Sequence, residues 1–184
     1  MSVASLRPRA AWSAIACATL LPCVPLMPGA AEAASPASGG ASSVAEPALQ
    51  FVLAITANID PVIDMGKTPL GERRVITISG GTFEGPGIKG TIMPGGEDWQ
   101  LTRTDGVTEF DARYWLKTDD GVIIKVYNRA IAAPAATAGG ERYLRTSPQF
   151  EAPTGKYDWL NKAIFIGTLT PGKGAVVLRY YKVI

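Results

Sequence analysis

The 184-residue chain contains no histidine, and its two cysteines, Cys17 and Cys23, both lie near the N-terminus. Without histidine, the chain can form neither a Ser-His-Asp triad nor a Cys-His pair. Zinc sites built on histidine or cysteine are also excluded from the chain beyond residue 23. No calcium-binding loop of the pattern D-x-[DN]-x-[DN]-G occurs. Acid–base chemistry would therefore depend on Asp, Glu, Tyr, Lys or Arg, and the sequence implies no metal and no cofactor.

The chain also lacks an excess of charge of either sign. It has 18 Lys and Arg against 16 Asp and Glu, a net charge of +2. Proteins that bind nucleic acid usually concentrate basic residues on one face or stretch, and no such concentration is present. We therefore do not expect nucleic acid as a partner.

The N-terminal region has the features of a secretory signal peptide. Arg7 and Arg9 precede an apolar stretch over residues 10–27, and Ala31-Glu32-Ala33 follows the A-x-A cleavage pattern. The apolar stretch is interrupted by prolines and is short for a membrane span, so an uncleaved anchor is the weaker alternative. We predict a periplasmic or secreted protein with no membrane span after cleavage.

The chain is predicted to divide into three parts. Residues 1–33 form the signal peptide. Residues 34–47, rich in Ala, Ser, Gly and Pro, form a disordered linker. Residues 48–184 form one domain, and the sequence leaves its oligomeric state open, with a homodimer among the options.

The domain is predicted to be all-β. No segment keeps a 3.6-residue apolar period over ten residues, and short β-branched and aromatic runs alternate with Gly- and Pro-rich turns. This pattern favours a single antiparallel β-barrel of about 8–10 strands, lipocalin-like in general architecture, over a sandwich. A barrel of that size can hold one small ligand. Residues 147–157, with two prolines and a glycine, are expected to be mostly loop.

The longest strand-like run, residues 107–117, has two alternating faces. Because side chains alternate across a strand, Asp111, Arg113 and Trp115 share a face opposite Ala112 and Tyr114. We predict that the face with Asp111 and Arg113 points into a cavity, where the guanidinium could hold a carboxylate, enolate or carbonyl oxygen. The alternative is a solvated pair on the outer surface, which contributes little.

Other candidate residues occur on either side of this run. Each has a structural alternative: Asp98 could cap a turn, Tyr143 could pack at the rim, and Glu151 could be a solvated loop carboxylate. Trp159 is a candidate pocket wall that could equally be part of the core. The glycines between residues 80 and 96 match no phosphate-binding pattern and indicate a bent sheet.

Several motifs occur in a fixed order along the domain. They are Gly80-Gly81-x-Phe83-x-Gly85-Pro86, Pro94-Gly95-Gly96-x-Asp98-Trp99, Asp111-Ala112-Arg113-Tyr114, Asp120-Gly121, Tyr143-x-Arg145-Thr146-x-Pro148-x-Phe150-Glu151 and Tyr157-x-Trp159-Leu160-Asn161. With these motifs the sequence resembles the bacterial and fungal family catalogued as domain of unknown function 3237, over nearly all of residues 49–184. The resemblance implies a compact β-barrel and no established general activity, and this chain departs from the pattern in its leader and in the Ala/Pro-rich loop over residues 130–140.

The sequence supports three hypotheses of function. In the first, the barrel binds a small, partly apolar organic molecule in its interior. In the second, the same cavity is a cofactor-free lyase, isomerase or cyclase, and in the third the barrel is structural and holds no ligand. The catalytic candidates are Asp98, Arg113, Tyr143 and Glu151. The ligand-binding candidates are Trp99, Asp111, Trp115, Arg145, Trp159 and Asn161.

Overall fold

A computed structural model describes residues 45–184, so the predicted signal peptide (1–33) and most of the predicted linker (34–47) lie outside the described residues. The described chain contains ten strands and one short 3-10 helix, η1. The prediction of an all-β fold is confirmed. The bounds are β1 Leu49–Ile59, β2 Ile63–Thr68, β3 Gly71–Gly85, β4 Ile88–Ile92, β5 Gly96–Thr102, β6 Thr108–Thr118, β7 Ile123–Ala133, β8 Tyr143–Glu151, η1 Asp158–Lys162, β9 Phe165–Pro171 and β10 Ala175–Val183.

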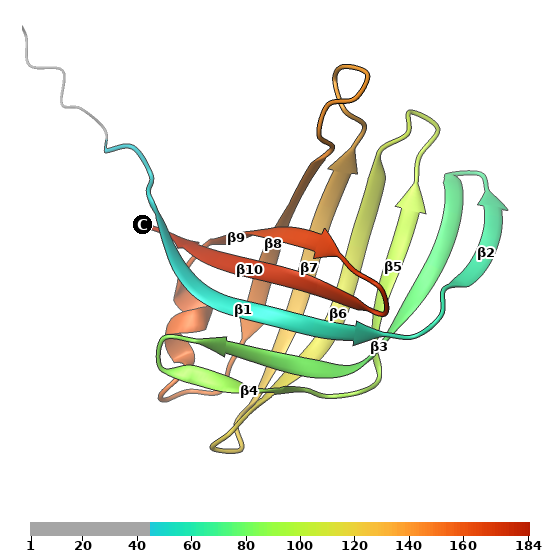
Figure 1. Cartoon of the computed structure of the whole chain (residues 1–184). Coiled ribbons are helices and arrows are strands. Elements are labelled where there is room, and N and C mark those ends of the chain that lie inside the picture. Colours follow the sequence, from blue (N-terminus) through green and yellow to red (C-terminus); the bar gives the residue numbers. More distant parts are fainter. Residues whose placement is uncertain (1–44) are drawn as a thin grey trace, which may run out of the picture. The chain divides into compact units, whose positions relative to one another are not determined.

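The strands form one antiparallel sheet that closes into a barrel (Figure 1). Closure depends on β1, which pairs with β10 on one side and with β3 on the other. From β10 the sheet continues through β9, β8 and β7 to β6. Both β4 and β5 bridge β6 and β3, each along a different part of those strands. The barrel therefore has eight strand positions, as predicted, and β2 extends the sheet along the first part of β3.

Glycines allow the strands to bend and cross closely. Gly81 in β3 has a φ of 133°, and a Cβ atom there would clash with the backbone carbonyl oxygen of Thr56 in β1. Gly96 in β5 lies against the Tyr114 side chain, with only 2.6 Å between an added Cβ and the Cβ of Tyr114. These glycines are needed for sheet geometry, as the sequence indicated.

Strand β8 is longer than the sequence predicted. It runs through Pro148 to Glu151, within the segment expected to be loop. Pro148 lacks an N–H donor, but β9 pairs with β8 only at Arg145 and Thr146. Beyond that point one side of β8 is an edge, where proline is tolerated.

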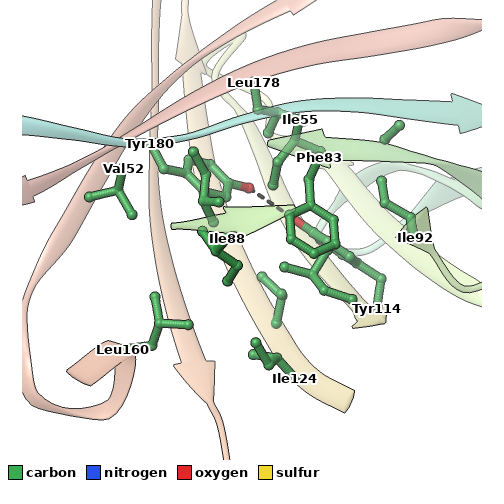
Figure 2. Close-up of a cluster of buried hydrophobic side chains, with 14 of the residues drawn as sticks. Val52, Ile55, Phe83, Ile88, Ile92, Tyr114, Ile124, Leu160, Leu178 and Tyr180 are labelled. Atoms are coloured by element: carbon green, nitrogen blue, oxygen red, sulfur yellow. Dashed lines mark hydrogen bonds between the residues drawn. The ribbon is translucent and has the colours of Figure 1, made fainter. Parts of the chain in front are cut away.

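The two ends of the barrel interior differ in how completely side chains fill them. At one end large apolar side chains form the core, which includes Leu160 of η1 (Figure 2). The opposite end, where the loop between β7 and β8 lies, contains the cavity described below. Among residues 45–184, no helix has the length and apolarity needed to cross a membrane. The core includes Val52, Leu53, Ile55, Phe83, Ile88, Ile92, Leu116, Ile124, Val126, Phe165, Leu178 and Tyr180.

Candidate functional site in the barrel interior

The interior at the loop-bearing end is a cavity of about 200 Å³. Its walls come from β1, β3, β5, β6, β7, β8, β9 and β10, and they are mainly apolar. Three of the wall residues, on β6 and β7, are alanines (Ala112, Ala130 and Ala132), and their small side chains leave this part of the barrel unfilled. The lining also includes the exposed residues Arg142, Pro171 and Gly172, so the cavity opens at this end.

A carboxyl group lies among the apolar walls. Asp98 is on β5, and its Oδ1 atom is shielded from solvent and accepts no hydrogen bond from residues 45–184. Its other oxygen, Oδ2, accepts a hydrogen bond of 2.5 Å from Nε2 of Gln100. The Oε1 atom of Gln100 in turn accepts from Nε of Arg74 at 2.7 Å. Three side chains from β3 and β5 therefore form a hydrogen-bonded chain along the cavity wall.

Burial raises the pKa of Asp98 above its ordinary value, because a carboxylate loses solvation in an apolar surrounding. The hydrogen bond from Gln100 and the positive charge of Arg74 act in the opposite direction, and the charge of Asp111 adds to the increase. The result is a carboxyl group that holds its proton more strongly than an exposed aspartate. Such a group can donate a proton or a hydrogen bond to a ligand.

Two phenols, Tyr114 and Tyr180, belong to the core cluster and point toward each other (Figure 2). The hydroxyl oxygens of Tyr114 and Tyr180 are 2.9 Å apart and share a hydrogen bond. Both side chains are buried, and burial raises the pKa of each phenol. Tyr114 also lines the cavity, so it places a neutral hydroxyl group at the inner end.

A further polar group, Asn128 of β7, lines the cavity wall. Its Oδ1 atom accepts a hydrogen bond from Oγ1 of Thr146 on β8, and both residues are buried. Its side-chain amide also carries two N–H donors. Asn128 and Asp98 come from different strands, so polar groups reach the cavity from two parts of its wall.

Of the predicted catalytic residues, the structure places one in the cavity. Asp98 lines it, but Arg113, Tyr143 and Glu151 point outward. Arg113 has a side chain 68% exposed, and its Nε atom lies 3.2 Å from Oδ1 of Asp111. Glu151 accepts from Nζ of Lys125 at 2.8 Å on the outer surface. The predicted interior position of these three residues is wrong.

The predicted ligand-binding residues also lie outside the cavity. Trp99, Asp111 and Trp115 line an open groove on the outer face of β5 and β6, together with Arg113. Arg145 is exposed on β8, and its guanidinium lies 5.5 Å from the ring centre of Tyr143. The sequence pattern correctly placed Asp111, Arg113 and Trp115 on one face of the strand, but it assigned that face to the wrong side of the barrel wall.

The last two predicted residues belong to η1 at the closed end. The ring of Trp159 packs against Phe165, with 6.2 Å between centroids. Asn161 holds the chain after β8, since its Oδ1 accepts from the Ala152 N–H and its Nδ2 donates to the Ala152 carbonyl, each at 2.8 Å. The structure therefore places both residues outside the cavity, and Trp159 is partly buried and packs against the core.

The physical reason for these errors is the polarity of the two faces of β6. The face with Ala112, Tyr114 and Leu116 can be buried at little cost. The opposite face would take the Asp111–Arg113 ion pair out of water, where desolvation of both charges can exceed their attraction. The apolar face is therefore the interior one.

Sequence reasoning missed Arg74, Gln100, Tyr114 and Asn128. Gln100 could have been found from Asp98, because residues two apart on a strand share a face. Tyr114 could have been found by placing the apolar face of β6 inside. No pattern in the sequence indicates that Arg74 or Asn128 reaches the same cavity, because this depends on strand pairing. Among the described residues, no group of three or more His, Cys, Asp or Glu side chains lies close enough to hold a metal ion.

Comparison with known proteins identifies similar chains. The family model described as "Protein of unknown function (DUF3237)" matches residues 47–183. A UPF0311 protein of Rhodopseudomonas palustris (strain TIE-1) is 35% identical over 146 residues, which covers 73% of this chain and 95% of the relative. The solved structure of a β-barrel-like protein from Acinetobacter baumannii superimposes with a TM-score of 0.71 at 30% identity, covering 76% of this chain and 98% of that one.

A more distant relative has a named activity. The hydroalkoxylation enzyme phnH of Penicillium herquei is 27% identical over 122 residues, which covers 66% of this chain and 74% of the relative. The solved structure of an enzyme from the same organism superimposes with a TM-score of 0.60 at 25% identity, covering 75% of this chain and 95% of that one. These proteins share the barrel fold with the present chain.

Proposed function

Because this chain belongs to the DUF3237 family, one relative of which is named as an enzyme, we propose that it binds a small, partly apolar organic molecule inside the barrel. The main support is the interior cavity itself, whose apolar walls surround an Asp98 oxygen that has no partner among the described residues. A cavity with mainly apolar walls and a few directed polar groups is the usual form of a small-molecule site.

The size of the cavity limits the ligand. At about 200 Å³ it is smaller than the roughly 300–1,000 Å³ typical of sites for drug-sized molecules. A single ring with one or two substituents fits this space better than a fused polycyclic compound. Its polar atoms would meet Asp98, Tyr114 and Asn128, and its apolar atoms would contact Ile76, Leu178 and the alanines.

A pair of variants of the full-length chain tests this proposal. Ala130→Leu adds a larger side chain to the cavity wall. Ala133→Leu makes the same substitution at the last residue of the same strand, β7, which does not line the cavity. A panel of small aromatic acids, phenols and quinones would be screened by thermal shift and then by calorimetry. We expect ligands that bind the wild type and the Ala133→Leu variant and bind the Ala130→Leu variant at least about tenfold more weakly, which is roughly 1.4 kcal/mol. Equal binding by all three chains would contradict the proposal.

The cavity also has the groups needed for cofactor-free proton transfer, which is our second candidate function. Hydroalkoxylation, the reaction in the name of the Penicillium relative, adds an O–H bond across a carbon–carbon double bond. In the proposed step, the protonated Asp98 gives its proton to one alkene carbon and a substrate hydroxyl oxygen bonds to the other. The hydroxyl proton then returns to Asp98, so that no cofactor is consumed. The raised pKa of Asp98 supports this role, because a general acid must hold its proton until it transfers it to the substrate.

Solvent deuterium provides a test that does not depend on knowing the natural substrate. Ligands from the screen that contain both an alkene and a hydroxyl group would be incubated in D₂O with the protein, and carbon-bound deuterium measured by mass spectrometry. We expect incorporation with the wild type and with Glu151→Gln, since Glu151 pairs with Lys125 on the outer surface. Asp98→Asn is expected to reduce it at least about 100-fold, the usual contribution of a general acid. Equal incorporation by Asp98→Asn and the wild type would rule out this role.

We also propose that the barrel acts outside the cytoplasm, after removal of residues 1–33. The support is the positive, apolar and small-residue pattern of that segment. Mass spectrometry of the protein recovered from the periplasm or medium tests this, with a mature N-terminus expected close to Ala34. Recovery of only full-length protein from the cytoplasm would contradict it.

A further inference from the structure

Three charged side chains line the interior cavity: Arg74, Asp98 and Arg142. Arg74 lies on β3, and Arg142 directly precedes β8. Both arginines are exposed, whereas Asp98 is more deeply placed, so the arginines lie toward the open end. The lining has a net positive charge whether or not Asp98 carries its proton.

Arg74 and Arg142 have no carboxylate at ion-pair distance among residues 45–184. Arg73 and Arg145 on the outer face also form no ion pair within this part of the chain, so the lack of a partner is not by itself distinctive. The distinctive feature of Arg74 and Arg142 is that both line one cavity with mainly apolar walls, so their two positive charges can act on the same ligand.

Arg74 is also held in position. Its Nε atom donates to Oε1 of Gln100, and Gln100 donates to Asp98. This leaves the terminal Nη atoms of the guanidinium to donate elsewhere. A guanidinium that is fixed through one nitrogen loses less conformational entropy when it binds an oxyanion.

From this arrangement we infer that the ligand is a small organic anion, with its carboxylate, phenolate or enolate oxygen at Arg74 and Arg142 and its apolar body among the inner walls. This inference rests on the proposed binding function and names the chemical class of the ligand. Guanidinium groups bind planar oxyanions through paired N–H donors, whereas a neutral amide cannot use both charges. The apolar inner walls favour an anion attached to a ring or branched chain rather than an inorganic ion.

Matched neutral and anionic ligands test the inference. Benzoate and cinnamate would be compared with benzamide and cinnamamide by calorimetry on the full-length protein, at low and high salt. We expect each acid to bind roughly 5- to 20-fold more tightly than its amide. This factor lies between the effect of an exposed ion pair and that of a hydrogen bond to a charged group. The preference should decrease as salt rises, since both arginines are exposed.

Neighbouring arginines on the outer face serve as controls. Arg74→Gln and Arg142→Gln should each remove most of the preference for the acid and leave amide binding unchanged. Arg73→Gln changes the neighbour of Arg74 on β3, and Arg145→Gln changes a residue of β8 three positions after Arg142. Both controls line grooves on the outer face, so they should leave the binding of both ligands unaffected.

The outcomes distinguish the inference from the function on which it rests. If the amides bind as tightly as the acids, in a way that Ala130→Leu weakens, the ligand class is wrong but the binding function stands. If the acids bind and only Arg73→Gln weakens them, the anion site lies on the outer face and the inference is overturned. If neither acids nor amides bind, the proposed function itself fails and the inference fails with it.

Discussion

The hydroxyl oxygens of Tyr114 and Tyr180 lie 2.9 Å apart in the barrel interior, although 66 residues separate them in the chain. Tyr180 is fully buried on β10, and Tyr114 lies on β6 at the boundary between core and cavity (Figure 2). Each phenol gives the other a hydrogen-bond partner that the surrounding apolar side chains cannot supply. The pair links two distant strands and also sets the inner end of the cavity.

We predict that Tyr180→Phe lowers the free energy of unfolding by about 1–3 kcal/mol, because it leaves the buried hydroxyl of Tyr114 without its partner. The double change Tyr114→Phe with Tyr180→Phe should cost less than the sum of the two single changes. Urea unfolding of the four proteins measures this coupling. Strict additivity would show that the two hydroxyls do not depend on each other.

Asp98 is expected to reduce stability at neutral pH. Its pKa is raised in the folded state, so its favourable contribution is complete below the unfolded pKa of about 3.9 and is lost as the pH rises through the folded value. At a pH above the folded-state pKa, each unit by which the pKa of Asp98 is higher in the folded than in the unfolded state lowers the free energy of unfolding by about 1.4 kcal/mol. Asp98→Asn should therefore raise the melting temperature at pH 7 and have little effect near pH 3. A lower melting temperature at pH 7 would contradict this prediction.

The opposite pH dependence is expected at the turn between β6 and β7. Asp120 accepts hydrogen bonds from Nζ of Lys156 at 2.8 Å, from the Tyr157 hydroxyl at 2.9 Å and from Thr118. These donors, with Lys156 first, hold the pKa of Asp120 well below its usual range. The stability that Asp120 contributes is therefore present above about pH 4 and lost as the pH falls through its lower folded value.

Asp120→Asn should accordingly lower the melting temperature at pH 7, and the difference from the wild type should shrink on acidification. The control is Asp119→Asn in the same turn, because the Asp119 carboxylate forms an exposed ion pair with Lys89, at 3.3 Å between Oδ2 and Nζ. Thermal melts between pH 2 and 7 would test the pair. An Asp119→Asn effect as large as that of Asp120→Asn would show that the general charge of the turn matters rather than this specific network.

Asn161 is expected to affect stability and not ligand binding. Its side chain makes two hydrogen bonds to the backbone of the buried Ala152, at the end opposite the cavity mouth. Asn161→Ala should lower the free energy of unfolding by roughly 1–3 kcal/mol and leave the calorimetric affinity for any cavity ligand unchanged. Lys162→Ala, which removes only an exposed pair with Asp158, is the matched control. A loss of ligand affinity in Asn161→Ala would contradict this prediction and would indicate that Asn161 contributes to ligand binding.

The sequence was sufficient for the fold class and for one residue of the site. Period-two runs with Gly and Pro between them predict antiparallel strands, and the absence of histidine leaves carboxyl groups as the main acid–base candidates. Asp98 was selected because it follows a glycine turn and precedes a tryptophan, although the sequence alone was equally consistent with a turn-capping role. Alternation also showed correctly that Asp111, Arg113 and Trp115 share a face.

Only the tertiary structure decided which face is inside and which residues surround Asp98. Alternation along a strand defines two faces but does not say which of them points into the barrel. On β6 the cost of desolvating Asp111 and Arg113 places the apolar face in the interior. Strand pairing then brings Arg74 of β3 beside Gln100 of β5, and Ala112 of β6 beside Asp98. The cavity exists because small side chains from distant parts of the sequence lie together at one end of a closed sheet. No local sequence pattern predicts that arrangement.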